Sequence, residues 1–281
     1  MLKVRVLTAA VLIPLTLAAL FLLGPLGWAT VTLVVVVLAA TEWADLARYP
    51  QRIWLLFAAA AFLIGFMLLF SPGSGFRPDA GWPDIVPLAV CGIATLFWLF
   101  VAPVWLAAGW RVESRLALAL LGWLILIATW VAVVQLQARS PWLLLALMAV
   151  VWIADTAAYF VGRALGRHRL APSISPGKTW EGVYGGLIAT ALYALVLVHF
   201  APEGGYTRAV SVVAVAGWVA VILCLTALSV VGDLFESFLK RQRGVKDSGK
   251  LLPGHGGVLD RIDALLAAMP AAALIAQYAL R

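Results

Sequence analysis

The chain has 281 residues, of which 64% are hydrophobic and only 12% are charged, and its mean hydropathy is +1.02. Soluble domains are typically about 45–50% apolar and about 25% charged, so this composition excludes a water-soluble protein. The formal net charge of +7 is no sign of nucleic-acid binding, because in a membrane protein basic residues mark one side of the bilayer.

Nine apolar segments are long enough to cross the hydrocarbon core of a bilayer, which takes roughly 20 helical residues. Their runs lack the alternation of barrel strands, so we expect an all-α integral membrane protein with about nine transmembrane helices. In chain order the segments are 6–23, 27–47, 53–70, 85–107, 116–136, 141–161, 182–200, 209–231 and 262–280. The first follows Lys3 and Arg5, as in a signal peptide, but no small-residue cleavage site follows it.

The joints between the segments are short, and the sequence has no internal repeat. A single polytopic domain over 1–281 is therefore predicted, with N-terminal helices in 1–140 and the helices and loops that carry the chemistry in 141–281. If the segments alternate, sixteen of the 20 Lys and Arg residues fall on one side, and the exceptions are Arg77, Arg139, Arg208 and Arg281. This asymmetry predicts a cytoplasmic N-terminus and a C-terminus on the outside.

Few acidic residues are present, and several lie in or near the apolar segments. A charge at mid-membrane costs about 2.5–3.5 kcal/mol on insertion scales, so such groups normally face partners or a wet cavity. Glu42 and Asp45, near the inner end of the second segment, and Glu113, in an inner loop, are expected to be solvated or paired with nearby arginines. Asp155 lies inside the sixth segment.

Residues 232–263 combine more charge and glycine than any other part of the chain. Four polar residues spaced three or four apart share one face of a helix: Asp233, Glu236, Ser237 and Lys240. Asp260 and Asp263 repeat this spacing at the start of the next helix. Two helix ends that bear carboxylates could converge on Mg²⁺, which takes one or two carboxylates and keeps its other positions for waters and phosphate oxygens.

Basic residues and glycines separate these acids. The basic residues suit an anionic phosphate ligand, and they are Lys240, Arg241, Lys246 and Lys250. The glycines around His255, at 254, 256 and 257, allow close backbone approach and present N–H groups at a helix start. The alternative is a positive-inside loop that touches lipid headgroups, but such a loop needs no interleaved acids.

A second polar stretch, residues 173–182, precedes the seventh segment on the same side. A lysine and hydroxyl groups at a helix start suit phosphate binding, and the candidates are Ser175, Lys178, Thr179 and Glu181. Gly177-Lys178-Thr179 is similar to the end of a P-loop, but that motif requires a glycine where Pro172 stands. A P-loop is therefore excluded.

The stretch from Ser237 to Asp263 resembles the signature of the phosphatidate cytidylyltransferases, the CDP-diacylglycerol synthases. The matching positions are Ser237, Lys240-Arg241, Lys246-Asp247, Gly249, Pro253, His255-Gly256-Gly257 and Asp260-Arg261-Ile262-Asp263. Residues 175–182 and Asp155 also resemble the family, although relatives often carry a second basic residue where Gly177 stands. The resemblance is close over the C-terminal half, and in the N-terminal half it extends only to hydropathy and length.

The resemblance implies an enzyme that makes CDP-diacylglycerol and pyrophosphate from CTP and phosphatidate, with Mg²⁺ and often a monovalent cation such as K⁺. It implies metal binding by Asp233 and Asp260. The remaining candidate catalytic residues are Lys240, Arg241, Lys246, Asp247, His255 and Asp263. The candidate substrate-binding residues are Ser175, Lys178, Thr179, Glu181, Ser237, Gly256, Gly257 and Arg261. His255 could donate to the leaving pyrophosphate or form a structural hydrogen bond in its turn.

The expected location is a bacterial inner membrane, with the active site facing the cytoplasm, membrane lipids around it and a homodimer as the assembly. A secondary transporter is an alternative, because intramembrane acids such as Asp155 also mark ion pathways. Transporters usually show paired repeats and broken helices, whereas here the polar chemistry lies on one side and in one half. A CDP-alcohol phosphatidyltransferase is a second alternative, but the sequence lacks the spaced Asp-Gly and Gly-x-x-x-Asp pattern of that class. A prenyltransferase could also use aspartates to bind Mg²⁺, but it would not explain the Lys-Arg and His-Gly-Gly elements.

Overall fold

The computed structural model of the chain describes residues 2–199 and 211–279. Glu203, Arg208, Arg281 and the ends of the predicted segments at 200, 209–210 and 280 lie outside the described residues.

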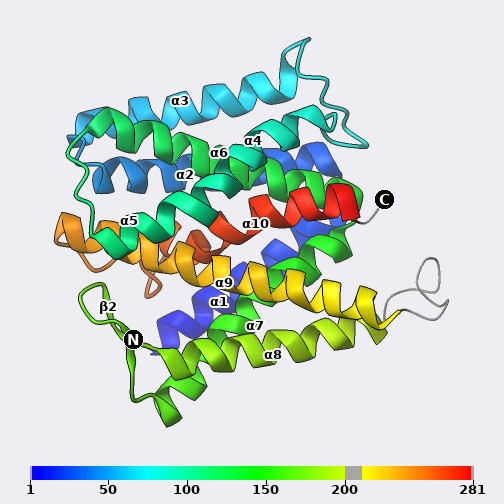
Figure 1. The fold of residues 1–281 in the computed structure, drawn as a ribbon. Helices are drawn as coiled ribbons and strands as arrows, with labels where there is room; N and C mark the ends of the chain where they lie inside the picture. Colours follow the sequence, from blue (N-terminus) through cyan, green and yellow to red (C-terminus); the bar gives the residue numbers. More distant parts are fainter. Residues whose placement is uncertain (1, 200–210, 280–281) are drawn as a thin grey trace.

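The described residues form a bundle of helices that run between two opposite ends (Figure 1). The helices are α1 (Leu2–Leu22), α2 (Pro25–Leu46), α3 (Gln51–Phe70), α4 (Ile85–Leu96), α5 (Ala102–Ala108), α6 (Arg115–Arg139), α7 (Pro141–Leu165), α8 (Trp180–His199), α9 (Val212–Arg243) and α10 (Leu259–Ala279). A π-helical turn, η1 (Phe97–Val101), joins α4 and α5 into one continuous stretch. Each of the nine predicted segments therefore coincides with a helical stretch.

Local sequence signals set several helix ends. Ser114, Ser140 and Ser211 cap α6, α7 and α9, and their hydroxyls accept hydrogen bonds from backbone N–H groups at 3.2–3.3 Å. Prolines begin α2 and α7, where a missing N–H costs nothing. Gly244 ends α9 with a left-handed backbone, at φ +79°.

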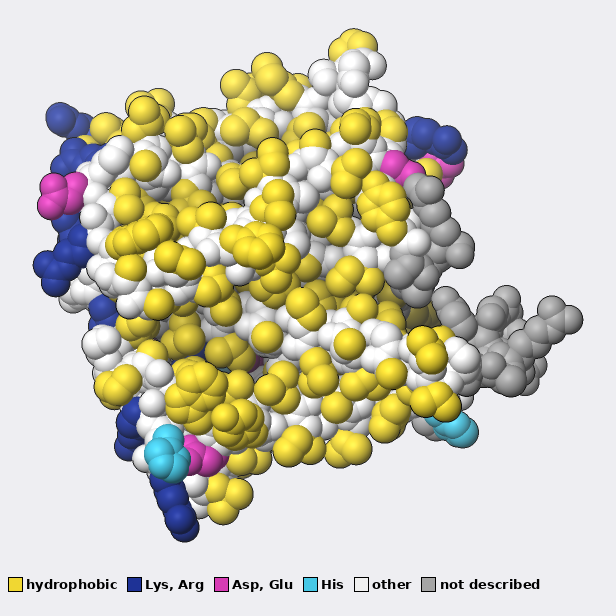
Figure 2. All heavy atoms as spheres, in the orientation of Figure 1, with side chains coloured by type: hydrophobic (Ala, Val, Ile, Leu, Met, Phe, Trp, Pro, Cys, Tyr) yellow, Lys and Arg dark blue, Asp and Glu magenta, His cyan; other side chains and the backbone are white. Residues whose placement is uncertain are grey.

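Seven helical stretches in the described parts of the chain are long and apolar enough to cross a membrane: α2, α3, the α4–α5 stretch, α6, α7, α8 and α9. Their outward faces carry large exposed hydrophobic side chains, such as Leu55 and Trp142. Figure 2 shows apolar side chains over the middle of the visible face, and most of the Lys and Arg on that face lie at one end. The protein is thus an all-α membrane protein in its main architecture.

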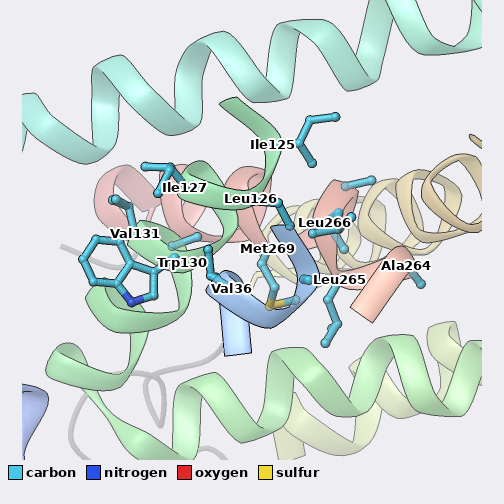
Figure 3. Close-up of a cluster of buried hydrophobic side chains, with 14 of the residues drawn as sticks. Val36, Ile125, Leu126, Ile127, Trp130, Val131, Ala264, Leu265, Leu266 and Met269 are labelled. Carbon is cyan, nitrogen blue, oxygen red and sulfur yellow. The ribbon is translucent and has the colours of Figure 1, made fainter. Parts of the chain in front are cut away.

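The core lies where α2, α6 and α10 meet (Figure 3). Trp130 of α6 is fully buried, and its Nε1 donates to the carbonyl oxygen of Ala29 in α2 at 2.9 Å. The Thr129 hydroxyl reaches the carbonyl oxygen of Leu266 in α10 at 3.3 Å. From Ala264 onwards most side chains of α10 are buried, so this helix fixes the position of the residues at its start.

One feature differs from the sequence expectation. A two-stranded antiparallel sheet, β1 (Arg169–Ala171) and β2 (Ser175–Thr179), precedes α8, so the all-α expectation is incomplete. The two prolines at 172 and 176 disfavour a helix here. The helix α9 continues past the predicted membrane segment to Arg243, as the shared helical face of the polar residues at 233–240 indicated. Basic residues in its last turn and the ion pair between Glu236 and Lys240 stabilise this part.

Candidate active site

The loops that follow α2, α5, α7 and α9 gather at one end of the bundle, where α1 also begins (Figure 1). We call this the basic end, and it comprises residues 47–50, 109–114, 166–179 and 244–258. Most of the Lys and Arg side chains on the visible face lie there (Figure 2). The two polar stretches singled out from the sequence are therefore adjacent in space as well as rich in charge.

The helices α9 and α10 approach each other closely beside the acidic residues. A Cβ atom added at Gly232 would lie 2.6 Å from the carbonyl oxygen of Asp263, so only glycine fits this crossing. Asp233 follows Gly232 directly, and its carboxylate interacts electrostatically with that of Asp263. Carboxylates from two different helices, those of Asp233 and Asp263, therefore lie near each other.

A lysine from the hairpin offsets the charge of Asp233. The Lys178 ammonium, on β2, forms an ion pair with the Asp233 carboxylate, and the Ser237 hydroxyl donates to the same carboxylate at 3.4 Å. The side chains of Lys178 and Asp233 are 26% and 27% exposed, so a ligand could reach both. Asp155, on α7, interacts electrostatically with this pair.

A second lysine bridges two more carboxylates. The Lys240 ammonium forms ion pairs with Glu236, one turn earlier on α9, and with Asp260 at 2.6 Å. The Asp260 carboxylate also accepts hydrogen bonds from the backbone N–H groups of Ser248 at 2.9 Å and Gly257 at 2.8 Å. Burial raises the pKa of the Asp260 carboxyl, but the hydrogen bonds from Lys240 and the two N–H groups outweigh it and lower the pKa below its ordinary value.

Three predicted residues near the hairpin make contacts within the protein. The buried Thr179 hydroxyl accepts from the Gly182 N–H at 3.2 Å and caps α8. Glu181 contacts the Nδ1 atom of His168 at 2.7 Å. Arg241 donates through Nε to the carbonyl oxygen of Ile174 at 3.1 Å, which ties α9 to the turn beside Ser175.

The 244–258 loop has some exposed side chains and some residues that hydrogen bonds hold in place. Lys246 and Asp247 are exposed. Gly256 has φ +83°, a conformation that favours glycine, and its carbonyl oxygen accepts from the Leu252 N–H at 2.9 Å. The carbonyl oxygen of His255 accepts from Arg261 at 3.1 Å, and its ring Nδ1 lies 3.4 Å from the carbonyl oxygen of Pro253.

The N–H groups at the start of α10, expected to face a substrate anion, are directed at carboxylates of the protein. Gly257 donates to Asp260 at 2.8 Å. The N–H groups of Val258 and Leu259 donate to the carboxylate of Glu42 at 2.9 and 2.8 Å. The anion that this helix start attracts is thus a side chain from α2.

Glu42 is the residue that the sequence interpretation missed. The expectation that it is solvated or paired with arginine is wrong: it is only 5% exposed, and the Ser248 hydroxyl is a third donor to it, at 3.0 Å. The expectation holds for Asp45, which pairs with Arg243 at 3.0 Å, and for the exposed Glu113. The available signal was the position of Glu42 inside a predicted membrane segment.

Mg²⁺ prefers hard oxygen ligands, and the acidic side chains at the basic end are the candidates for them. The residues described do not hold three His, Cys, Asp or Glu side chains arranged as a ready metal site. Asp233 and Asp260 nevertheless supply hard oxygen atoms, and Mg²⁺ in phosphate-transfer sites usually takes only one or two carboxylates. Hard oxygen donors of this kind come from two packed helices at one end of the bundle, so the chemistry of the donor set suits this cation.

An open cavity of about 710 Å³ lies beside the hairpin. Its lining combines basic and aromatic side chains with Glu181, and the residues are Arg167, His168, Arg169, Pro172, Trp180, Glu181 and Tyr184. Space for a ligand is therefore present next to the second polar stretch.

Comparisons with known proteins cover almost the whole chain. The sequence model of a family described as the cytidylyltransferase family matches residues 3–279. The chain is 39% identical over 283 residues to a phosphatidate cytidylyltransferase of Haemophilus influenzae, covering 96% of each chain. It is 40% identical over 274 residues to one of Pseudomonas aeruginosa, covering 96% of this chain and 95% of that relative. Over 124 residues, 43% of this chain and 42% of the relative, it is 53% identical to one of Brucella suis.

Proposed function

We infer the chemistry of this site from one premise: the chain belongs to the cytidylyltransferase family. It is a nucleotidyltransferase of phospholipid biosynthesis that transfers the cytidylyl group of CTP to phosphatidate, giving CDP-diacylglycerol and pyrophosphate. The observation that carries this function is the identity of about 40% to phosphatidate cytidylyltransferases along 96% of the chain. A transporter, a CDP-alcohol phosphatidyltransferase and a prenyltransferase do not agree with these matches.

The main physical obstacle to the reaction is repulsion between two polyanions. The phosphate of phosphatidate is already anionic near neutral pH, so its oxygen attacks the α-phosphorus of CTP without a strong base, and pyrophosphate leaves. Two unit charges about 4 Å apart interact by roughly 4 kcal/mol at an effective dielectric constant of 20. Positive charge must therefore be fixed where the phosphates meet.

We propose that Lys178 and Lys240 supply part of this charge and that Asp233 and Asp260 hold Mg²⁺, with a monovalent cation such as K⁺ as a second ion. When bound, Mg²⁺ neutralises charge on phosphate oxygens. Each lysine is paired with one of these two aspartates. The lysine ammonium has three N–H donors. When the paired aspartate also binds a cation, the lysine can direct some of these donors to a phosphate oxygen.

Exposed basic residues in the 244–258 loop and in the helices on either side of it would complete the phosphate contacts. We propose that Lys246, Arg241 and Arg261 face the triphosphate or the lipid phosphate, and that Asp247 and Asp263 orient lysines or bound water. Ser237 supports Asp233 through the hydrogen bond described above. His255 either donates to the leaving pyrophosphate or holds its turn.

The membrane placement completes the proposal. We propose nine transmembrane helices in a bacterial inner membrane, with the basic end and the active site facing the cytoplasm, and a homodimer as the assembly. The gathering of Lys and Arg at one end supports this orientation, because cytoplasmic loops are enriched in these residues (Figure 2). α1 begins at the basic end and α10 ends at the other, which agrees with an odd number of crossings (Figure 1).

The function is tested by product analysis with the detergent-purified protein. With phosphatidate and Mg²⁺, CTP should yield CDP-diacylglycerol and pyrophosphate, and ATP, GTP and UTP should yield far less product. Turnover in detergent needs no sealed compartment, so it separates an enzyme from a transporter. Absence of a cytidylyl lipid product from CTP in an intact, correctly folded preparation would contradict the function.

Lys246→Ala is expected to raise the apparent KM for CTP or phosphatidate by roughly 10- to 100-fold, because a hydrogen bond to a charged group contributes about 1.5–3 kcal/mol. Lys246 is exposed, so the change should leave the melting temperature unaltered. The measurement is a pair of saturation curves. Arg52→Ala, which removes another exposed cation from the same end, is the control. Unchanged curves for both substrates would rule out a phosphate contact at Lys246.

A further inference from the structure

The carboxylate of Glu42, in the N-terminal half of the chain, accepts hydrogen bonds from the 244–258 loop and from the first residue of α10. It accepts three hydrogen bonds, from the Ser248 hydroxyl at 3.0 Å and from the N–H groups of Val258 and Leu259 at 2.9 and 2.8 Å. These donors lie 206 to 217 positions further along the chain. With a side chain that is buried and three donors aimed at it, Glu42 is a built-in anion at the start of α10.

The loop is shaped to admit this carboxylate. A Cβ atom at Gly257 or at Gly249 would overlap the carboxylate oxygens of Glu42. Two glycines of the loop therefore leave the space that Glu42 occupies. The neighbouring Trp43 fixes the helix that carries it, because the indole Nε1 donates to the carbonyl oxygen of Leu118 in α6 at 2.8 Å.

Ser248 couples Glu42 to the proposed metal ligand. Its hydroxyl donates to Glu42, while its backbone N–H donates to Asp260 at 2.9 Å. Asp260 itself follows Leu259, whose N–H is held by Glu42. The same Asp260 carboxylate contacts Lys240 at 2.6 Å. A displacement of Glu42 would thus be transmitted to the carboxylate and the lysine of the site.

We propose that Glu42 is a positioning residue for cytidylyl transfer: it holds the 248–259 loop and the start of α10 so that Asp260 and Lys240 keep their places. This inference rests on the proposed function of those two residues. Glu42 touches no reacting atom, so its loss should lower turnover while leaving the affinity for both substrates largely intact.

The test measures kcat and KM for CTP and phosphatidate in Glu42→Gln and Glu42→Ala, per mole of folded enzyme and well below the melting temperature. Loss of a residue that holds a metal ligand in place typically lowers metal affinity or activity 10- to 100-fold. We expect kcat to fall by this factor, KM values to change less than threefold, and the Mg²⁺ requirement to rise. Trypsin cleavage at the exposed Lys246 and Lys250 should become faster, since the loop loses its anchor.

Asp45→Asn is the matched control, because it removes a carboxylate from the same helix whose partner, Arg243, lies outside the loop. Its kcat should stay within twofold of wild type, and its tryptic cleavage should be unchanged. If the Glu42 variants do not fold, Ser248→Ala removes one of the three contacts without uncovering a charge and should lower kcat 3- to 10-fold.

The outcomes distinguish a wrong function for the protein from a wrong role for Glu42. If the wild-type enzyme makes no cytidylyl lipid, the proposed function fails. If the wild type is active and folded Glu42→Gln has normal kcat, Mg²⁺ dependence and tryptic cleavage, only the role of Glu42 is overturned. A variant that merely melts earlier, with normal kcat per folded molecule, would likewise show that Glu42 is structural and does not position the site.

Discussion

Asp260→Asn is expected to lower cytidylyl transfer by roughly 100-fold or more, which is the scale on which removing one electrostatic stabiliser acts. Asparagine keeps the size of the side chain but removes the charge that Lys240 contacts at 2.6 Å. Its amide nitrogen would also face donors, because the Ser248 and Gly257 N–H groups both point at this carboxylate. Initial rates measured against Mg²⁺ concentration should show both a lower maximum and a higher Mg²⁺ requirement.

The control for this substitution is Asp79→Asn at the opposite end of the bundle. Asp79 is exposed, and among the contacts described it pairs only with Arg77, at 3.2 Å. The turnover of the Asp79→Asn variant should therefore stay within twofold of wild type. If inserted and folded Asp260→Asn kept the wild-type rate and the wild-type Mg²⁺ curve, the assignment of Asp260 as a metal ligand would be wrong.

Lys240→Met should both destabilise the protein and abolish most of its activity. The Glu236 side chain is only 2% exposed, and Lys240 is the cation beside it. Removing one partner of a buried ion pair typically costs about 3–5 kcal/mol, because the other charge is left uncompensated. A clear fall in the melting temperature in detergent, together with a loss of turnover, is the expected result.

A compensating variant separates stability from chemistry. Replacing both partners, as in Glu236→Leu with Lys240→Met, removes the buried charge of Glu236 together with its cation, and apolar replacements of buried pairs are often neutral. Asp260 also loses Lys240 but keeps the hydrogen bonds from the N–H groups of Ser248 and Gly257. The double variant should regain the part of the melting temperature that the uncompensated Glu236 charge costs, but not the turnover, since the cation beside Asp260 is still missing. Recovery of the wild-type rate would exclude a role for Lys240 in the reaction.

The helices could be predicted because their signals are local. Each apolar run is long enough to span a bilayer, and serines, prolines and glycines mark several ends within one turn of the observed boundaries. The hairpin at 169–179 was not predicted, because a three-residue strand leaves almost no alternating pattern to detect. Hydropathy ended the eighth membrane segment at 231, whereas the helical spacing of the polar residues at 233–240 indicated that the helix continues, and Gly244 ends it with a left-handed backbone.

The candidate site could likewise be predicted only in part from the sequence. The residue types and the i, i+3 and i, i+4 spacing in 232–263 indicated convergent carboxylates, and Gly232 at the crossing of α9 and α10 provides the close approach. The spacing could not tell which cation offsets which acid. Lys178 pairs with Asp233 only because the hairpin folds back onto α9.

The amino-acid sequence alone determined the membrane class, the helical segments, the charged end and the chemical family, because each depends on composition, periodicity or a contiguous motif. Only the tertiary structure decided that Glu42 occupies the start of α10 and that Lys240 joins Glu236 to Asp260. Those pairings depend on how α2, α6, α9 and α10 pack, and side-chain packing between distant segments leaves no periodic trace along the chain.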